Sequence, residues 1–478
     1  MSERIPADLH NTLTETKESL LLPPEEVQVS DFLGLRDESI REIYDALVNE
    51  NTEQVNNFLE NLSSSDKAEL LEKANRETRK SLMLGFAPYF DADVISILQE
   101  DVRTHVLEDM SAEQVAKILS DLDSDDALDI VAPLDPELQQ EIMRKLSAKI
   151  RIALEEGLSF PEDSAGRLMQ REFVAVPQFW TVGKTIDYLR AARDTLPDDF
   201  YDLIVIDPSH HVVGEIPLNR LVRSQRSVKI DDLTLEEVHL IPSSMDQEEV
   251  AIIFRNENLV SAPVVDDSGR LIGIITYDDV IYVIDEEAEE DLLKLAGVKE
   301  DDLYRNIIST ASSRSRWLLI NLLTAFLAAS VISLFDATIE KIVALAVLMP
   351  IVAGMGGNAG TQAMTVAVRG IATNELSGTN AWRVIGKETA VGIINGVLFA
   401  ALIGLIAGLW FQDTGIGAVI AAAMIINLIV AGFFGASIPV ILNKFNIDPA
   451  VASSVFLTTM TDVIGFFAFL GLASIFLI

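Results

Sequence analysis

The chain has 478 residues and a formal net charge of −37, from 36 basic and 73 acidic residues. So acidic a chain is not expected to bind nucleic acid, because that affinity comes from Lys and Arg on phosphate. It contains no cysteine, which excludes disulfides, thiolate metal sites and a cysteine nucleophile.

Charge and hydrophobicity divide the chain into two parts. Residues 316–478 hold six basic and seven acidic side chains, so residues 1–315 carry the other 30 and 66. The acidic part would repel an anionic membrane surface unless cations intervened, which makes divalent cations its natural small partners. The last third is strongly apolar and is expected to lie in a membrane.

The N-terminal third predicts helices. Residues 1–30 are polar and contain prolines, and we expect them to be flexible. In residues 31–160, apolar residues recur at spacings of three and four, as in 112–119 and 138–146. Helix pairs that recur in this way would stack into an all-α superhelical domain, whereas an irregular helical bundle fits the pattern equally well.

Residues 161–285 contain an internal repeat. Residues 203–221 align with residues 262–280, so that Asp207 matches Asp266 and Gly214 matches Gly273. Each copy predicts a strand, a turn, a second strand and a helix. The pattern resembles a tandem pair of CBS domains, which are α/β modules.

The second copy carries the more specific part of this resemblance. Its segment 273–280 is similar to the segment with which CBS domains hold the ribose of an adenine nucleotide such as ATP. The resemblance gives that role to Thr276 and Asp279. The first copy departs from the pattern, with Pro217 and Arg220 at the matching places, and a purely mechanical module is the alternative.

An acidic helix leads from the repeat towards the membrane, in a connecting segment that we place at residues 286–312. Like charges this dense destabilise a helix through i, i+3 and i, i+4 repulsion. A solvated linker is one interpretation, and a ligand set for a hard, oxygen-seeking cation is the other, which the position of the helix favours. The crowded residues are Asp285, Glu286, Glu287, Glu289, Glu290 and Asp291.

Residues 313–478 predict an α-helical domain with five membrane spans, each close to or beyond the roughly 20 residues that cross a bilayer. Basic residues lie near one set of span ends, and only Lys341 lies near the other. This bias predicts a multi-pass protein of the plasma (inner) membrane, with cytoplasmic N-terminal domains and the C-terminus outside. The predicted spans are residues 317–335, 342–368, 389–411, 416–442 and 450–478.

The run from Pro350 to Gln362 brings four glycines, an Asn and a Gln to membrane depth. Irregular or closely approached backbone is tolerated there only where it is buried in protein or lines a cavity. A tight helix contact through small residues is the alternative, and this segment alone leaves both open.

Asp462 is the one ionisable residue within the last span. A carboxylate at that depth is expensive and marks an ion path by default, and no Lys or Arg lies at midspan to pair with it. A carboxylate beside glycine carbonyls offers the oxygen ligands that a hard cation such as Mg²⁺, which sheds water reluctantly, prefers. No redox ligand or nucleophile accompanies the site, so we do not expect an enzyme.

These parts, in this order, resemble the MgtE family of magnesium channels over residues 31–478. The resemblance is carried by residues 160–169, the acidic helix, the run 350–362 and residues 448–465. It implies a homodimer in membrane lipid, with Mg²⁺ as substrate and the pore between two protomers. The implied pore positions are Asp462, the backbone of Gly354, Gly357 and Thr458, and Thr361, where the family often has Asn.

The resemblance also implies a gate. In the family the acidic helix plugs the pore when Mg²⁺ bridges it to the CBS and N-terminal domains. Two family positions are not acidic here, Asn258 and Tyr282. Mg²⁺ would neutralise carboxylates that otherwise repel and splay the domains, so that low Mg²⁺ opens the pore. The matching acidic residues are Asp125, Asp129, Asp246, Asp279, Glu287, Glu290 and Asp291.

The expected function is therefore selective Mg²⁺ uptake, gated by intracellular Mg²⁺. A transporter of broader divalent specificity, for example for Co²⁺ or Mn²⁺, is the first alternative, and the all-oxygen site without His or Cys argues against it. A non-transporting membrane sensor is the second. Asp462 and the glycine run argue against that, because an anchor needs neither.

Overall fold

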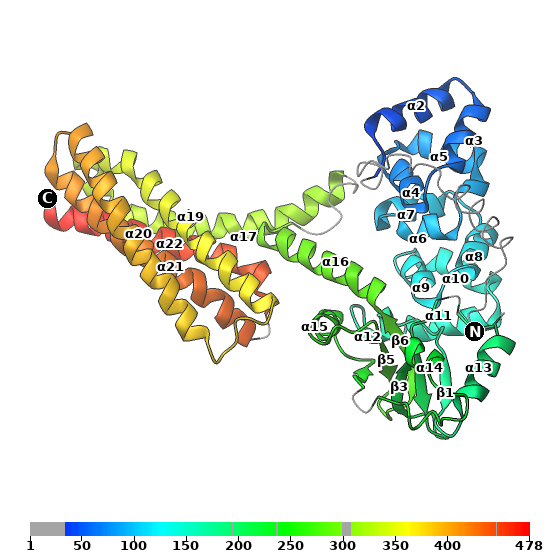
Figure 1. The fold of residues 1–478 in the computed structure, drawn as a ribbon. Helices are drawn as coiled ribbons and strands as arrows, with labels where there is room; N and C mark the ends of the chain where they lie inside the picture. The colour runs from blue at the N-terminus through cyan, green and yellow to red at the C-terminus, as the bar shows by residue number, and fades with distance from the viewer. Residues whose placement is uncertain (1–33, 194, 198, 236–237, 299–306, 446) are drawn as a thin grey trace, which may run out of the picture. The chain divides into compact units, whose positions relative to one another are not determined.

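The structure, a computed structural model, describes residues 34–193, 195–197, 199–235, 238–298, 307–445 and 447–478 (Figure 1). The segment 1–30, for which we expected flexibility, lies outside these ranges. The chain divides into two compact units. The first unit extends to Ser244 and includes Pro263–Ile274, and the second comprises Met245–Ala262 and Ile275–Ile478.

Short α-helices build the N-terminal part of the first unit, as predicted. Ser63 and Ser111 each begin a helix with a capping box, which satisfies backbone N–H groups that a helix end leaves free. Helices of 6 to 12 residues are unstable alone, so burial of their apolar faces in one shared core must hold them. The helices are α2 (Asp37–Val48), α3 (Thr52–Glu60), α4 (Ser64–Lys73), α5 (Arg76–Gly85), α6 (Ala92–Ile97), α7 (Glu100–Glu108), α8 (Ala112–Ser120), α9 (Ser124–Val131), α10 (Pro136–Lys145) and α11 (Ala148–Gly157).

The predicted repeat forms two three-stranded sheets of the same design. In each, a short strand pairs in parallel with the first strand of the copy, which is flanked on its other side by the second strand. The first sheet contains β1 (Ala175–Pro177), β2 (Asp202–Ile206) and β3 (Val212–Pro217), and the second contains β4 (Ile241–Pro242), β5 (Ser261–Val265) and β6 (Leu271–Thr276). Their helices are α12 (Ala165–Leu168), α13 (Val182–Ala191), α14 (Leu218–Val222), α15 (Gln247–Glu257) and α16 (Tyr277–Leu295).

The two turns of the repeat are equivalent in atomic detail. Asp207 Oδ1 accepts hydrogen bonds from the backbone N–H groups two and four residues later, and Asp266 Oδ1 does the same. A Cβ on Gly214 or on Gly273 would overlap a neighbouring side chain, so neither position admits a larger residue. The aligned aspartates and glycines therefore have the same structural role in both copies of the repeat.

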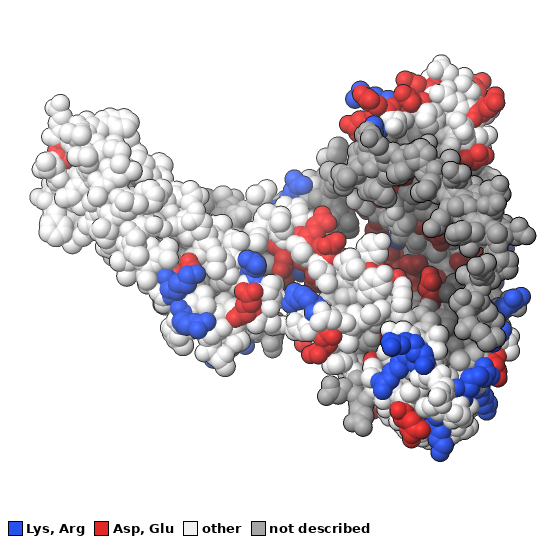
Figure 2. All heavy atoms as spheres, in the orientation of Figure 1, with Lys and Arg blue, Asp and Glu red and all other residues white. Residues whose placement is uncertain are grey.

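The second unit contains five helices long and apolar enough to cross a membrane, which agrees with the five predicted spans. They belong to α17 (Ile307–Ser333), α19 (Ala344–Ala372), α20 (Ala381–Trp410), α21 (Thr414–Lys444) and α22 (Pro449–Phe476), with the short α18 (Asp336–Lys341) between the first two. Figure 2 shows their surface almost free of charge, with charged side chains gathered towards the end nearer α16.

Helix α21 is central to this bundle. It packs along α19, α20 and α22, and 56% of its most apolar stretch is buried. Its approach to α20 is close because glycines lie in the contact: a Cβ on Gly392 would overlap the carbonyl of Leu428, and one on Gly432 would overlap the carbonyl of Glu388. Small residues commonly make such contacts in membranes, where close backbone approach replaces the hydrophobic effect.

Helix α19 is continuous although Pro350 lies inside it. Proline removes one backbone donor, but here it does not end the helix. The run from Pro350 to Gln362 is regular α-helix, so the irregular backbone considered from the sequence is not found in it. Close backbone approach is the feature that remains.

Candidate functional site

The glycines of α19 lie on two different faces. A Cβ on Gly356 would overlap the side-chain amide of Asn427, and one on Gly360 would lie 2.8 Å from Leu457 Cδ1. A Cβ on Gly354 or Gly357 would have no atom of the described residues within 4 Å. The two interpretations of the run thus apply to different residues, since one pair of glycines packs and the other pair faces open space.

The open face of α19 is polar. Gly354, Gly357, Thr361 and Thr365 recur at spacings of three and four, so they share one side of the helix. Thr361 Oγ1 donates to Gly357 O at 2.9 Å, and Thr365 Oγ1 donates to Thr361 O at 2.9 Å. Both threonines are exposed in the single chain. Polar groups and bare backbone on a span suit water or another protein surface better than lipid.

Asp462 lies on α22 at the height of this open face. Gly360 packs on Leu457, five residues before Asp462, while Gly356 contacts the same amide as Gly465, three residues after it. Along the helix axes, Asp462 therefore lies between the positions of Gly360 and Gly356, the two packed glycines of α19. Its carboxylate is half-buried and has no hydrogen-bond or ion-pair partner among the described residues.

Thr458 precedes Asp462 by one turn and is exposed on the same side of α22. Its Oγ1 donates to Ser454 O at 3.0 Å, a bond within its own helix. The predicted pore residues thus lie on one face of α19 and on one side of α22, two helices that pack on each other. Gly354, Gly357 and Thr361 come from α19, and Thr458 and Asp462 come from α22.

The acidic helix α16 presents two different sets of carboxylates. Asp285, Glu286 and Glu289 are exposed, whereas Glu287, Glu290 and Asp291 are partly buried. The helix also packs on the bundle through Leu295, which contacts an apolar cluster from α19, α21 and α22. That cluster contains Met364, Val368, Ile438, Leu442, Ala450 and Leu457.

Lys294 links α16 to the first turn of α22. Its Nζ lies 3.1 Å from Asp448 Oδ2 and also pairs with Glu290 one turn earlier. Burial lowers the pKa of Lys294, but the hydrogen bonds with both carboxylates outweigh that effect and raise the pKa above its usual range. Asp448 also caps α22 by accepting from the backbone N–H of Ala450 at 2.8 Å. The end of α16 is thus tied to the start of the last span.

Further carboxylates of α15 and α16 lie close enough to perturb one another. Burial raises the pKa of Glu248 to about 7, and the charges of Glu287 and Asp291 add to the effect. Burial also raises the pKa of Glu287, although its Oε1 accepts from Gln247 Nε2 at 2.8 Å. The pKa of Asp291 is raised by burial and by the charge of Asp448. A cation bound among these carboxylates would reduce their mutual repulsion.

Thr276 and Asp279, the predicted nucleotide pair, lie together in the second unit. Thr276 Oγ1 donates to Asp279 Oδ2 at 2.8 Å. Asp246 is the N-cap of α15 and accepts from the N–H of Glu248 at 2.9 Å. Asn258, one of the two non-acidic family positions, ends α15 in the left-handed conformation at φ +54°, which Asn tolerates well.

Two predicted regulatory residues lie in the first unit, on α9. Asp129 forms an ion pair with the buried Arg103, with Nη2 and Oδ2 at 2.7 Å. Asp125 lies in the first turn of the same helix, where a negative charge is favourable. In the part of the chain that the structure describes, no three Asp, Glu or His side chains converge closely enough to hold a metal ion.

Sequence reasoning missed four residues of these sites. Glu248 carries no local signal, since an acidic residue in the first turn of a helix is common. Asp448 belongs to the segment 448–465 that carries the family resemblance, but its pairing with Lys294 was not visible in the sequence. Lys294 could have been found, because it follows Glu290 at the i, i+4 spacing of a helical ion pair. Asn427 could also have been found, as an amide at midspan in a long apolar helix.

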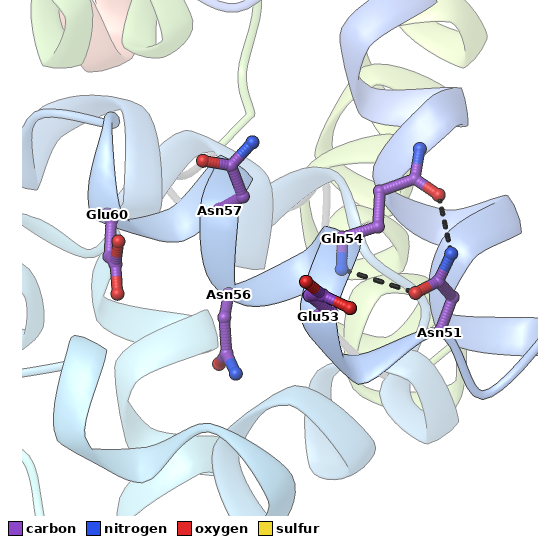
Figure 3. Close-up of a pocket in the computed structure, with 6 residues that line it drawn as sticks. All are labelled: Asn51, Glu53, Gln54, Asn56, Asn57 and Glu60. Atoms are coloured by element: carbon purple, nitrogen blue, oxygen red, sulfur yellow. Dashed lines mark hydrogen bonds between the residues drawn. The ribbon is translucent and has the colours of Figure 1, made fainter.

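A polar pocket of about 550 Å³ lies along α3 in the first unit (Figure 3). Asn51 and Gln54 are joined there by two hydrogen bonds. The lining comes from one helix and its N-cap, so ligands do not converge from several elements, and we do not assign a function to it. The lining residues are Asn51, Glu53, Gln54, Asn56, Asn57 and Glu60.

The domain with five candidate spans carries a carboxylate at mid-depth that has no partner in the described ranges, and it is joined to a helical domain and a CBS pair. This is the architecture of a polytopic membrane transporter for cations. The comparisons agree. The family described as divalent cation transporter (MgtE) matches residues 349–472, the MgtE intracellular N domain matches 62–163, and the CBS domain matches 230–286. The chain belongs to the MgtE family, a family of transporters rather than of enzymes.

Three curated relatives are similar over most of their length. The chain is 33% identical to magnesium transporter MgtE of Bacillus subtilis (strain 168) over 321 residues, 67% of this chain and 71% of the relative. It is 34% identical to that of Enterococcus faecalis over 324 residues, 68% and 71%. It is 31% identical to that of Thermus thermophilus over 346 residues, 72% and 76%.

A solved structure of the cytosolic domain of the Mg²⁺ channel MgtE in complex with ATP is also similar. It is 28% identical, with a TM-score of 0.47, and the match covers 51% of this chain and 99% of that one. A second solved structure, of the soluble part of a magnesium transporter, is 27% identical, with a TM-score of 0.46, and covers 52% and 98%.

Proposed function

We propose that the protein is a Mg²⁺ channel whose pore follows the open faces of α19 and α22. One observation carries the proposal: Asp462, a carboxylate without a partner among the described residues, lies at midspan of α22, and α22 packs on α19, the helix with the open polar face. The relatives named as magnesium transporters support the choice of ion. The proposed ligands are Asp462, Gly354, Gly357, Thr361 and Thr458.

The chemistry of these groups suits a hydrated hard cation. Mg²⁺ sheds water reluctantly and demands octahedral oxygen coordination, so carboxylate and carbonyl oxygens would accept hydrogen bonds from its water shell. Each backbone carbonyl has two lone pairs, so a helical carbonyl can accept a second hydrogen bond. Gly357 O already accepts one from Thr361 Oγ1, and that hydroxyl would have to turn away for Gly357 O to bind the water shell. The open glycines leave room for such a shell where a side chain would fill it.

A second copy of the chain would complete the pore. The open face exposes glycine backbone and threonines that lipid does not satisfy. A homodimer in which these faces meet would cover them and bring two Asp462 carboxylates to one ion. The two Asp462 carboxylates, one from each protomer, would then balance the double positive charge of Mg²⁺.

The orientation follows from charge near the span ends. Basic residues near membrane spans favour the cytoplasmic side. We propose that the helical and CBS domains are cytoplasmic and that the C-terminus is outside, in the plasma membrane. The residues that support this orientation are Arg314, Arg316, Arg369, Arg383, Lys387 and Lys444.

The acidic helix would act as the gate. Leu295 and Lys294 hold its end against the ends of the spans, while its partly buried carboxylates and Glu248 repel one another. Mg²⁺ bound among these carboxylates would remove the repulsion and favour the docked, closed state, so low Mg²⁺ would open the pore. The proposed regulatory ligands are Asp125, Asp129, Asp246, Asp279, Glu287, Glu290 and Asp291.

We also propose that the second CBS copy binds an adenine nucleotide. The support is the bond between Thr276 Oγ1 and Asp279 Oδ2, which holds both side chains where the ribose hydroxyls of ATP would compete for them. A carboxylate that accepts from a ribose hydroxyl would distinguish a nucleotide from free phosphate.

Uptake of Mg²⁺ into proteoliposomes tests the proposed function. We expect flux into vesicles that contain the protein, and little reduction of that flux by equimolar Co²⁺ or Mn²⁺. Comparable flux of Co²⁺ or Mn²⁺ would favour the broader transporter. No flux of any divalent ion, with internal Mg²⁺ removed to release the gate, would favour a sensor without transport.

Two adjacent glycines separate pore lining from packing. Gly357→Val should stop Mg²⁺ flux and leave a folded dimer, because its side chain would enter the open space that we assign to the pore. Gly356→Val should instead destabilise the fold by at least about 1–3 kcal/mol, since its side chain would overlap the buried amide of Asn427. Flux and thermal unfolding of both variants are the measurements. A monomeric Gly357→Val protein would instead assign this face to packing alone.

Glu248 should make Mg²⁺ closure depend on pH. The pKa of Glu248 is about 7 in the folded chain, against an ordinary value of 4.5. At a pH between these two values, the folded chain therefore binds more protons than the unfolded chain. Without Mg²⁺, stability should therefore fall as the pH rises through this window. Mg²⁺ requires the deprotonated form, so its affinity should rise by up to about tenfold per pH unit below the pKa.

Protection of α16 from protease by Mg²⁺ at pH 6, 7 and 8 checks this expectation. Glu248→Gln should flatten the pH dependence between pH 6 and 7. The matched control is Glu249→Gln, a neighbouring residue that is exposed, which should keep the wild-type dependence. An unchanged pH dependence in Glu248→Gln would show that another group titrates.

A further inference from the structure

Asn427 is a buried amide in the middle of the bundle. It lies near the centre of α21 and its exposed fraction is 0%. An amide at this depth is unfavourable unless its hydrogen bonds are met inside the protein. Its surroundings should therefore explain why the helix carries an amide at this position.

The amide touches both helices that carry the open face. Asn427 Nδ2 donates to Val352 O of α19 at 2.7 Å. A Cβ on Gly356 of α19 would overlap this amide, and a Cβ on Gly465 of α22 would lie 2.9 Å from Asn427 Oδ1. The two glycines therefore leave just the space that the amide fills.

The contacting glycines are close neighbours, along α19 and α22, of the proposed ion ligands. Gly356 lies between Gly354 and Gly357, and Gly465 follows Asp462 by three residues. Any shift of α22 along α19 would move Asp462 relative to the open glycines, and it would also break the fit around Asn427. The amide thus ties the height of the carboxylate to the height of the glycine face.

We propose that Asn427 is a positioning residue for the permeating ion: it sets the register of α19 against α22 and so the distance from Asp462 to the open glycine face. The inference rests on the proposed function and adds a residue that contacts neither the ion nor the open face. A contact of glycines alone offers few side chains that resist sliding. The hydrogen bond to Val352 O fixes Asn427 of α21 at one height on α19, and α22 is held at that height because Gly465 packs on the same amide.

The lack of a hydrogen bond at the amide oxygen of Asn427 supports a role in helix register rather than in stability. Asn427 Oδ1 is buried and accepts no hydrogen bond from the described residues. An unsatisfied buried acceptor is destabilising, so an apolar side chain of equal size would be the better choice for stability alone. The amide is then retained for the bond that its nitrogen makes.

The test compares Asn427→Leu with the wild-type protein in proteoliposomes. Leucine keeps the volume and removes the donor. We expect a folded dimer whose half-saturating Mg²⁺ concentration rises by about three- to thirtyfold and whose preference for Mg²⁺ over Co²⁺ falls. The matched control is Ser437→Ala, another buried polar residue of α21, which should leave both quantities unchanged.

A second variant keeps the test decisive if Asn427→Leu does not fold. Asn427→Ala frees space that Gly465→Ala can occupy, so the double variant restores packing without the hydrogen bond. We expect it to recover thermal stability relative to Asn427→Ala but to keep the raised half-saturating concentration. Recovery of wild-type half-saturation and ion preference in the double variant, or their retention in folded Asn427→Leu, would overturn the inference.

Asp462→Asn in the same vesicles separates this inference from the proposed function. If Asp462→Asn loses conduction while the Asn427 variants behave as wild type, only the positioning role is wrong. If Asp462→Asn itself conducts like the wild type, the pore assignment fails first.

Discussion

Asp462→Ala is expected to abolish Mg²⁺ conduction and to leave a folded dimer. Asp462 is the one ionisable residue of the last span, and its carboxylate has no partner among the described residues whose loss would destabilise the fold. Attraction between unit charges about 4 Å apart at an effective dielectric constant near 20 is worth roughly 4 kcal/mol per unit of ion charge. Loss of such an interaction would lower flux at least about a hundredfold.

Radioactive or fluorescent Mg²⁺ uptake, with size-exclusion profiles beside it, measures this effect. Asp462→Asn keeps the shape of the side chain and should also fail to conduct or lose selectivity. Asp413→Asn is the matched control, because it makes the same chemical change at an N-cap outside the spans, where Asn also caps well. The pore assignment would be wrong if purified Asp462→Ala carried Mg²⁺ at the wild-type rate.

The triple variant Glu287→Gln, Glu290→Gln and Asp291→Asn is expected to stay open at millimolar internal Mg²⁺. These are the partly buried carboxylates of the segment 285–291, and two of them have their pKa raised by burial and neighbouring charge. Removing them weakens the Mg²⁺-bound closed state and spares the open one. A coupling of a few kcal/mol would raise the closing concentration at least about tenfold.

The same helix offers a control with an equal change of charge. Asp285→Asn, Glu286→Gln and Glu289→Gln neutralise three exposed carboxylates of α16 and should leave closure unchanged. Flux at several internal Mg²⁺ concentrations measures closure, and Mg²⁺ protection against protease reports docking. If the first triple variant closes at the wild-type Mg²⁺ concentration with unchanged protection, α16 is a passive linker and Mg²⁺ is sensed elsewhere.

Features that depend on residues close together in the chain were predicted well from the sequence. The spacing of apolar residues predicted the helices of residues 31–160, because a helix buries whichever face its own period makes apolar. The repeat was visible because both copies need the same turn, with Asp207 and Asp266 in the same role. The five spans followed from length and hydropathy alone, since a bilayer sets both.

Asp462 was also evident from the sequence, for a physical reason. A single carboxylate in a long apolar segment stands out because its burial is so unfavourable that function is the default explanation. The acidic cluster of α16 was equally visible as a run of like charge. In both cases the signal is a residue that conflicts with its own local surroundings.

The tertiary structure decided which residues of each pattern are buried and which partners they contact. The local pattern could not separate Gly357, which faces open space, from Gly356, which packs on Asn427, because the two differ only in their distant neighbours. Only the family resemblance had placed Gly357 in the pore. The family resemblance selected Glu287, Glu290 and Asp291, but no local pattern showed that they are more buried than their acidic neighbours in α16. The pairing of Lys294 with Asp448 was also not visible in the sequence. Packing between segments far apart in the chain sets burial and partners, and no local pattern encodes those.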